Sequence, residues 1–471
     1  MSKEDLFQKV DGNLIFDGID LENEIASKYG TPTYLFSVKK IRENINHLST
    51  TFRKHYPKIE IAYSMKNNML PEICAVISEE LTTFETTSLL EMKLVEQMMV
   101  KSGKPLKLIS TNLYKSDGFL EQLLSFPNIK KKMGYDNYSK LIAIDSYQDL
   151  LNVERVAKKL NIKPKVLIRV NPGIKMSREK AIFASAFASA KCSSIIKNTE
   201  PIVSASKDEN ITDYLEERIY EPKFDFAENL IDLAYKSEHL DLIGIHGHLG
   251  SQITNLEYFH NFFEVITIFY KLMQEKYENK LEILDLGGGY PANYNQFEKV
   301  PTIDQIAESL SSKIAHAKIE PKVIIESGRY ITASSSMLLT RVNLTKESSS
   351  GSKLAVVDLS VYSDLLDVIT ARWIFESELV NNIPLKTDGS YKQNWQLVGS
   401  TNDALDQLNP ITENHERTFP RKLLPGDLIA IKNTGAYTTC FNSNYSGKPK
   451  PLIVLLNENK DRRIQLIRNR S

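Results

Sequence analysis

Eight short apolar runs, separated by stretches of helical periodicity, constrain the fold of this chain most strongly. They occupy residues 59–65, 81–84, 106–110, 141–145, 165–171, 242–250, 281–288 and 322–327. Strands that are apolar on both faces are typical of parallel sheets, and parallel neighbours need crossover helices between them. The pattern therefore predicts an α/β chain whose centre is a parallel (β/α)8 barrel of the TIM type.

The chain of 471 residues is longer than one barrel requires. After about residue 340 the helical rhythm fades, and β-like runs alternate with Gly, Pro and Asn clusters. We therefore expect a barrel over residues 35–340. Residues 1–34 and 341–471 are expected to form a β-rich domain, resembling a sandwich or barrel.

The connection between the fifth and sixth strands is unusually long, and we expect an insertion at about 174–240. Connections of this length in compact domains are functional or disordered. Its Ala/Ser-rich part, AIFASAFASAKCSSI, is compatible with a helix over the barrel mouth and equally with an unstructured insert.

Composition excludes several classes of partner. Lys plus Arg and Asp plus Glu both number 59, which gives no electrostatic basis for binding nucleic acid or an anionic membrane. No apolar run is long enough to cross a bilayer. Cys74, Cys192 and Cys440 have neither metal-ligand nor disulfide-framework spacing. We expect a soluble, cytoplasmic protein without a metal ion.

Chemistry in a β/α barrel is carried at the carboxyl ends of its strands. Lys66 follows the first strand, where desolvation could make its amine a carbonyl nucleophile. His246 and His248 end the sixth strand; a lone H-x-H is a weak metal signal, whereas a flat imidazole can stack on an aromatic cofactor. Ser251 could donate to a phosphate.

The last two strands end in residues suited to an anionic ring cofactor. Glycines 287–289 follow the seventh strand and let backbone N–H groups close on an anion. Glu326 could keep a pyridine nitrogen protonated, and Arg329, after Gly328, could reach a phosphate. Together with Lys66 and His248, these residues predict a pyridoxal 5'-phosphate (PLP) site with a Schiff base on Lys66.

The ordered motifs also resemble a known family. The segments include AYSMKNNMLPEI, FETTSLLEM, LIRVNPG, GIHGHLGSQI, LDLGGGYP, ESGRYITASSSMLL and LLPGDLIAIKNTGAYTTCFNSNYSGKPKP. They are similar to those of the barrel-type PLP-dependent decarboxylases of the alanine-racemase-like fold, most closely the diaminopimelate decarboxylases. The resemblance runs from near residue 10 to near residue 457.

The resemblance implies a role for each matching residue. Lys66 matches the Schiff-base lysine, His248 the ring-stacking histidine and Glu326 the partner of the pyridine nitrogen. The matching phosphate contacts are Ser251, Gly288, Gly289, Arg329 and Tyr437, and Gly328 is expected among the cofactor-binding residues. Glu85 stands where the family usually has Asp, and Arg169 matches the arginine of its L-R-V-N-P run. The resemblance further implies a homodimer with shared active sites.

The chain departs from the family near residue 400, in Gly-Ser-Thr-Asn-Asp. Asn402 replaces the family's catalytic Cys. Asp403 replaces a Glu, as in the ornithine-decarboxylase branch, and could pair with a substrate ammonium. The residues expected to grip a distal carboxylate are not recognisable in LLDVITARW, where Arg372 is the nearest candidate.

Three hypotheses follow for the function. The first is a PLP-dependent carboxy-lyase acting on an amino acid or amino-acid conjugate, with Lys66, His248, Asn402 and Asp403 at the reacting centre. The second keeps PLP but makes the reaction a racemisation or a decarboxylation that ends in transamination. The third is a non-catalytic PLP-binding or regulatory relative.

Overall fold

The computed structural model describes most of the chain. The described residues are 6–125, 140–174, 194–195, 226–278, 280–294, 299–347, 349, 351–381, 393–408, 416–459, 461 and 463–469. The expected insertion at about 174–240, with its Ala/Ser-rich part, lies largely outside them, as does Cys192.

The chain divides into two compact units. The barrel unit comprises Ile45–Pro291 and Val300–Gly328, and the β unit comprises Met1–Asn44, Ala292–Lys299 and Arg329–Ser471. Each unit is described by itself. Among the described residues, no helix is long and apolar enough to span a bilayer.

The barrel unit contains the eight predicted strands, each close to its expected position. They are β5 (Ile59–Ser64), β6 (Thr83–Thr86), β7 (Lys107–Ser110), β8 (Lys140–Ile144), β9 (Lys165–Asn171), β11 (Asp241–Gly247), β12 (Ile283–Asp285) and β13 (Lys322–Ser327). Every neighbouring pair is parallel, and β13 pairs with β5 while β8 pairs with β9. The ring of strands is therefore closed, which confirms the predicted barrel. A two-residue strand, β10 (Ser194–Ile195), adds to β9.

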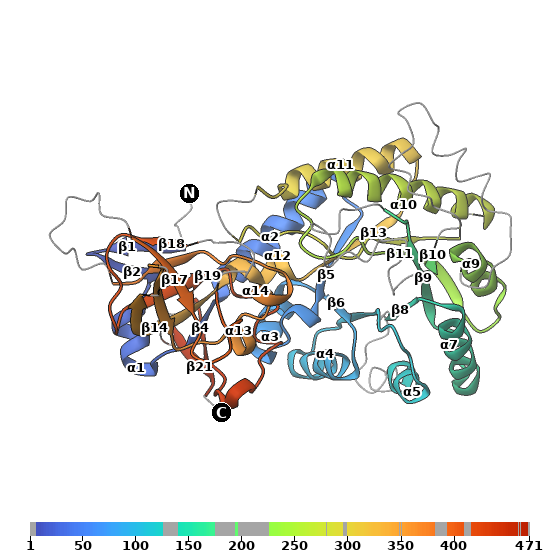
Figure 1. Cartoon of the computed structure of the whole chain (residues 1–471). Coiled ribbons are helices and arrows are strands. Elements are labelled where there is room, and N and C mark those ends of the chain that lie inside the picture. The colour runs from blue at the N-terminus through green and yellow to red at the C-terminus, as the bar shows by residue number, and fades with distance from the viewer. Residues whose placement is uncertain are drawn as a thin grey trace. The chain divides into compact units, whose positions relative to one another are not determined.

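Helices alternate with these strands along the chain, as the parallel pairing requires. They are α2 (Val38–His55), α3 (Pro71–Glu80), α4 (Leu89–Ser102), α5 (Asp117–Ser125), α7 (Tyr147–Leu160), α9 (Ala227–Lys236), α10 (Leu256–Lys276) and α11 (Ile303–Ala317). Helices α10 and α11 run side by side (Figure 1). Local sequence sets helix ends: Ser88 and Glu91 form a capping box that begins α4, and Gly103 ends it in a left-handed conformation.

The interior of the barrel is filled by side chains from nearly every strand. Seven of them, one each from seven strands, form a buried apolar cluster: Ala62, Ile109, Leu141, Leu167, Ile243, Ile283 and Ile324. The barrel is thus a packed core rather than a pore, and its polar chemistry is confined to the strand ends.

The β unit confirms the expected β-rich domain. A small antiparallel sheet contains β1 (Phe7–Val10), β2 (Asn13–Phe16) and β3 (Ile19–Asp20). A larger mixed sheet contains β4 (Thr33–Ser37), β14 (Ser336–Glu347), β15 (Lys353–Val357), β16 (Ser377–Leu379), β17 (Gln393–Val398), β18 (Arg417–Phe419), β19 (Leu428–Lys432), β20 (Leu452–Leu456) and β21 (Ile464–Arg468). Its short helices are α1 (Ser27–Tyr29), α12 (Arg329–Thr332), α13 (Val361–Asp364) and α14 (Asp367–Thr370).

Residues far apart in sequence build this larger sheet. Strand β4 pairs with β14 on one side and with β20 on the other.

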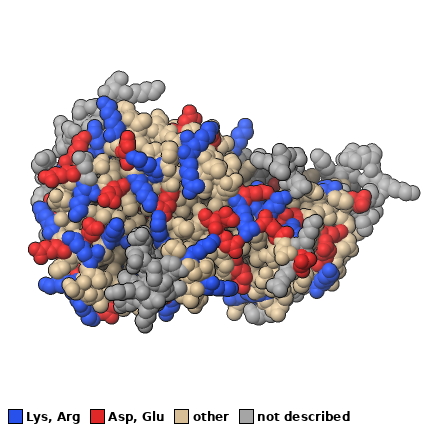
Figure 2. All heavy atoms as spheres, turned by 180° about the vertical axis from the view of Figure 1, so that it is seen from behind, with Lys and Arg blue, Asp and Glu red and all other residues tan. Residues whose placement is uncertain are grey.

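The surface charge is mixed: on the face drawn in Figure 2, blue and red side chains are interspersed over the described part. This distribution agrees with the equal numbers of acidic and basic residues in the sequence.

Candidate active site

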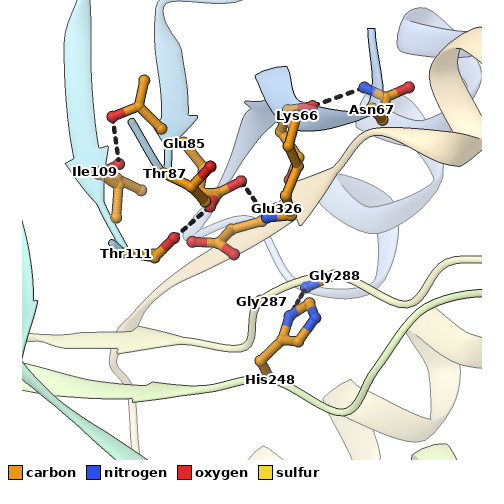
Figure 3. A network of polar contacts seen from close by, with 12 residues as sticks. Lys66, Asn67, Glu85, Thr87, Ile109, Thr111, His248, Gly287, Gly288 and Glu326 are labelled. Atoms are coloured by element: carbon orange, nitrogen blue, oxygen red, sulfur yellow. Dashed lines mark hydrogen bonds and ion pairs between the residues drawn. The ribbon is translucent and has the colours of Figure 1, made fainter. Parts of the chain in front are cut away.

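Lys66 lies directly beyond β5, in the single turn Met65–Asn67. Its Nζ donates to Oε2 of Glu85, the third residue of β6, at 2.6 Å (Figure 3). Glu85 is fully buried, whereas the Lys66 side chain is one-third exposed. The ammonium group is therefore held at the barrel end against a buried counter-charge, while part of the side chain stays accessible.

A second group holds the Glu85 carboxylate from the other side. Thr111, one residue beyond β7, donates its hydroxyl to Oε1 of Glu85 (Figure 3). A buried carboxylate is tolerated when both oxygens have partners, and here one partner is a cation and the other a hydroxyl. Glu85 is thus a fixed anchor for Lys66.

His248 lies beyond β11 and faces the glycine run (Figure 3). The backbone N–H of Gly288 donates to its Nδ1 at 2.9 Å. Burial lowers the pKa of His248 well below its usual value, and the nearby Arg169 and Lys66 charges lower it further. The imidazole is therefore neutral, with Nδ1 as acceptor, which suits a ring that stacks on a cofactor rather than one that titrates.

The glycines that follow β12 leave no space for side chains. Gly287 has φ +60°, and a Cβ there would lie 2.5 Å from Nδ1 of His248. A Cβ on Gly288 would lie 2.7 Å from the carbonyl oxygen of Glu326. The loop after β11 packs beside this run, because the N–H of Ile253 donates to the carbonyl of Gly289 at 3.0 Å. Ser251 belongs to that same loop, so the predicted phosphate contacts of the barrel unit lie on adjacent loops.

Glu326, near the end of β13, belongs to a buried group of three titratable side chains. Its Oε1 lies 3.4 Å from Nε2 of His246. Asp285, the register partner of His246 on the next strand, completes the group. One ligand atom of each residue lies within 4.8 Å of the others, so such a group could hold a metal ion. The same three side chains also set the charge that a pyridine nitrogen would meet.

Electrostatic interactions shift the pKa values of the two carboxyl groups in this group of three in opposite directions. Burial alone would raise the pKa of Glu326, but His246, Lys66 and Arg169 outweigh it and hold that pKa below its usual value. Burial and the adjacent Glu326 charge raise the pKa of Asp285 well above its usual value. The negative charge of the pair is therefore carried by Glu326, as a partner for a protonated ring nitrogen requires.

Arg169, on β9, contributes a second buried cation near the strand ends. It is the register partner of His246 and lies 4.0 Å from Asp145, the residue after β8. Among the predicted site residues of the barrel unit, the structure thus brings together Lys66, Glu85, Arg169, His248, Gly288 and Glu326. Gly328, which follows β13, is packed so that a Cβ would lie 2.7 Å from the Asn67 side-chain nitrogen.

Arg329 and Tyr437 belong to the β unit, where they contact each other. The Arg329 guanidinium lies 4.5 Å from the ring centroid of Tyr437 and 4.0 Å from that of Trp373. Its Nη1 donates to the Tyr294 hydroxyl at 2.6 Å. Tyr437 has a left-handed backbone, with φ +54°.

The remaining predicted residues also lie in the β unit. Asp403 accepts from the Tyr362 hydroxyl at 2.9 Å and from the Tyr445 hydroxyl at 3.2 Å. Asn402 and Arg372 are both exposed. Trp373, the residue after Arg372, rather than Arg372 itself, contacts the Arg329 guanidinium.

Sequence reasoning missed several polar residues of the site. Thr111 and Asp285 were not singled out, and His246 was considered only as half of a weak metal motif. Thr111 follows β7 directly and Asp285 is the last residue of β12. Examining the ends of all eight strands, instead of the most suggestive four, would have found both.

Comparison with known proteins adds a family. The model of the pyridoxal-dependent decarboxylase pyridoxal-binding domain matches residues 42–214 and 201–333, more than half of the chain. Diaminopimelate decarboxylase of Aquifex aeolicus is 25% identical over 467 residues, which is 98% of this chain and 94% of that protein. The enzyme of the same name from Vibrio cholerae is 25% identical over 457 residues, or 96% and 93% of the two chains.

Solved structures share the fold. Diaminopimelate decarboxylase from M. jannaschii, in co-complex with L-lysine, superposes with a TM-score of 0.79 at 22% identity, covering 99% of this chain and 95% of that one. Lysine/ornithine decarboxylase from Vibrio vulnificus, complexed with putrescine, has a TM-score of 0.66 at 19% identity, with coverages of 93% and 98%.

These matches confirm the expected family, cofactor and enzyme class. The glycine cradle, the partly exposed Lys66 side chain and the anionic Glu326 agree with them, because each suits one part of pyridoxal phosphate. The chain belongs to the pyridoxal-dependent decarboxylases, enzymes that release carbon dioxide from amino acids with pyridoxal phosphate as cofactor.

Proposed function

We propose that this chain decarboxylates an amino acid or amino-acid conjugate with PLP bound as a Schiff base on Lys66. The observation that carries the proposal is the placement of the Lys66 amine, 2.6 Å from the buried carboxylate of Glu85 at the carboxyl end of the barrel. This is the end where β/α barrels carry their chemistry.

The described side chains fit the parts of the cofactor. Lys66 would carry its aldehyde carbon, His248 would cover its ring and Glu326 would accept a hydrogen bond from its ring nitrogen. Its phosphate would be met by Ser251, Gly288, Gly289, Arg329 and Tyr437, and Gly328 would also line the cofactor site. When bound, the cofactor supplies an electron sink for the electron pair left by carbon dioxide.

The protein's own contribution is positioning and charge. Glu85 orients the Lys66 amine, and Arg169 helps to keep Glu326 ionised and His248 neutral. We assign Lys66 as the group that returns a proton to the substrate carbon, since Asn402 replaces the thiol that the family resemblance implies.

For the substrate we propose an amino acid with a distal ammonium group. Asp403 supports this, because its carboxylate is presented by two tyrosine hydroxyls and could pair with a cation. Arg372, the alternative distal contact, would instead select a carboxylate. Diaminopimelate, lysine and ornithine as test substrates separate the two cases, since only the first carries a distal carboxylate.

The assembly we propose is a homodimer with shared active sites, located in the cytoplasm. Mixing K66A with D403A subunits tests the shared site. If each site takes Lys66 from one chain and Asp403 from the other, the mixture regains activity that neither variant has alone. The proposed folding domains, 35–340 and 1–34 with 341–471, can be checked by limited proteolysis.

The central experiment measures the products of the purified, PLP-loaded protein. Release of carbon dioxide with a stoichiometric amine from one of the test amino acids supports decarboxylation. Absence of both products across basic, acidic and conjugated amino acids contradicts it.

Asn402 favours one second candidate, a decarboxylation that ends in transamination. Without a thiol to deliver a proton to the substrate carbon, protonation on the cofactor side would release pyridoxamine phosphate. Conversion of the absorbance to that of pyridoxamine phosphate during turnover identifies this outcome, and inversion of the substrate without gas release identifies racemisation. A protein that takes up no PLP would instead be a non-catalytic relative.

A further inference from the structure

The β unit holds the Arg329 side chain in a cluster assembled from distant segments. Arg329 begins α12, Trp373 follows α14, Tyr437 follows β19, and Tyr294 comes from the segment Ala292–Lys299. Arg329 is 6% exposed and Tyr294 is 3% exposed. A buried guanidinium is costly unless its surroundings compensate it, so the composition of this cluster needs an explanation.

Aromatic rings provide most of that compensation. The guanidinium carbon lies 4.0 Å from the centroid of Trp373 and 4.5 Å from that of Tyr437. Trp373 is itself stacked on Tyr294, with centroids 4.8 Å apart and planes inclined by 23°. A guanidinium stacked on rings loses rotational freedom while its N–H groups still point outward in its own plane.

The Tyr294 hydroxyl fixes the orientation of the guanidinium within that plane. It accepts from Nη1 of Arg329 at 2.6 Å. Burial raises the pKa of Tyr294 to about 12, even though Arg329 lowers it, so the phenol stays protonated. Tyr294 therefore orients Arg329 without adding a negative charge.

Asp367 is the negative group of the cluster, but it holds Arg329 loosely. Its Oδ2 lies 3.8 Å from Nη1 of Arg329, beyond hydrogen-bond distance. Asp367 is 2% exposed, and its Oδ2 is buried with no hydrogen-bond partner. Its Oδ1 accepts from Thr370.

We propose that Trp373 and Tyr294 are positioning residues that hold Arg329 for the phosphate of the cofactor, with Asp367 as a counter-charge that the phosphate must outcompete. This inference rests on the proposed function, which assigns Arg329 to the phosphate. It assigns new roles to three residues: two strengthen phosphate binding, and one weakens it.

The proposal is testable because it predicts weaker PLP binding when Trp373 or Tyr294 is changed and tighter PLP binding when Asp367 is changed. Apparent dissociation constants are measured for PLP and for pyridoxal, which has the same aldehyde and ring but no phosphate, by the absorbance of the Schiff base with Lys66. Trp373→Leu is expected to weaken PLP binding about tenfold and to leave pyridoxal binding unchanged. Tyr294→Phe is expected to weaken PLP binding less, and Trp373→Phe to restore most of the affinity because it keeps a stacking ring.

Asp367→Asn is expected to tighten PLP binding about threefold to tenfold at pH 8, because it removes a charge that repels phosphate. Burial raises the pKa of Asp367 to about 6, although Arg329 lowers it. The ratio of wild-type to variant affinity should therefore approach one as the pH falls below about 6. In the described part of the chain, Arg329 acts on Asp367, and Arg329, Asp367 and Tyr437 act on Tyr294. Protonation of the phosphate, whose second pKa is about 6, weakens the same repulsion and moves the ratio in the same direction.

Two matched controls separate these roles from general damage. Trp395→Phe changes the other tryptophan of the chain, buried on β17. Asp364→Asn removes another buried carboxylate, whose pKa burial raises to about 7. Neither should alter the preference for PLP over pyridoxal. Thermal unfolding of each variant identifies any that do not fold, in which case Trp373→Phe and Tyr294→Phe carry the test.

The outcomes distinguish failure of the inference from failure of the proposed function. If wild-type protein takes up neither PLP nor pyridoxal, the proposed function fails and the inference fails with it. If wild-type protein binds PLP but Trp373→Leu affects both ligands equally, or Asp367→Asn weakens PLP binding, the positioning roles are wrong while the proposed function stands.

Discussion

The two ends of the barrel carry similar ion pairs whose acidic side chains differ in burial. At the amino ends of the strands, Glu60 of β5 contacts Lys107 of β7, at 2.9 and 3.0 Å, and also Lys322 of β13. At the carboxyl ends, Lys66 meets Glu85 at 2.6 Å. Side-chain exposure is 15% for Glu60 but zero for Glu85, whereas Lys66, at 34%, is about as exposed as Lys107, at 36%.

This difference separates a structural ion pair from a functional one. Exposed pairs exchange hydration for attraction at little net gain, typically well under 1 kcal/mol. A buried charge costs several kcal/mol in lost hydration and is rarely retained for stability alone. The amino-terminal cluster therefore needs only a structural explanation, whereas the burial of Glu85 together with the position of its pair at the carboxyl ends of the strands favours a role in chemistry.

The largest expected effect is that of Lys66→Ala. It should abolish the visible absorbance of bound PLP and reduce decarboxylation to background, because Lys66 is the amine that we propose carries the aldehyde. Lys58→Ala, which removes an exposed partner of Glu320 near the opposite end of β5, should change neither. If the Lys66 variant kept its visible absorbance and its turnover, the distinction between the two ends of the barrel would be wrong.

The second-largest effect is expected for Glu85→Gln. The Lys66 amine would lose its buried counter-charge, and we expect turnover to fall on the order of a hundredfold while the protein still folds. Glu85→Asp keeps the charge and should lose much less. Steady-state rates and PLP absorbance measure both, and a Gln variant as active as wild type would place this pair with the structural ones.

Lys115→Met probes a buried pair that the proposed chemistry does not use. Lys115 has no exposed side-chain surface, and its Nζ donates to Asp149 at 2.7 Å. Removing it leaves Asp149 buried without its cation, which should lower the free energy of unfolding by about 3–5 kcal/mol in urea denaturation. The double variant Lys115→Met, Asp149→Leu should recover most of that loss. If it does not, Lys115 has a role beyond stability.

The smallest effect is expected for Glu60→Gln, about 0.5–1 kcal/mol at pH 7. Burial would raise the pKa of Glu60, but Lys322, Thr83 and Lys107 hold it below its usual value. A carboxyl with a lowered folded-state pKa stabilises the fold above its unfolded pKa and loses that contribution as the pH falls through the folded pKa. The difference between wild type and variant should therefore shrink as the pH falls from the usual glutamate pKa through the lowered folded-state pKa, and added salt should reduce it at pH 7. A loss of turnover with unchanged stability would contradict a purely structural role.

Much of the candidate site could be predicted because the ends of apolar strands can be located in the sequence. Lys66, His248, Gly288 and Glu326 each follow or end an apolar run, and parallel pairing requires such ends to meet on one side of the barrel. Glu85 and Arg169 came from family resemblance alone, since nothing local distinguishes a buried acid or arginine from an exposed one.

What the sequence by itself determined was the set of strands and the residues that could meet at their ends. Only the tertiary structure decided which of these residues lie close enough to change one another's protonation. His246, Asp285 and Glu326 become one electrostatic group because the closed ring makes β11, β12 and β13 neighbours. The order of their protonation follows from burial and from distances of a few ångströms, and Coulomb energies at that range depend on geometry that local sequence does not encode.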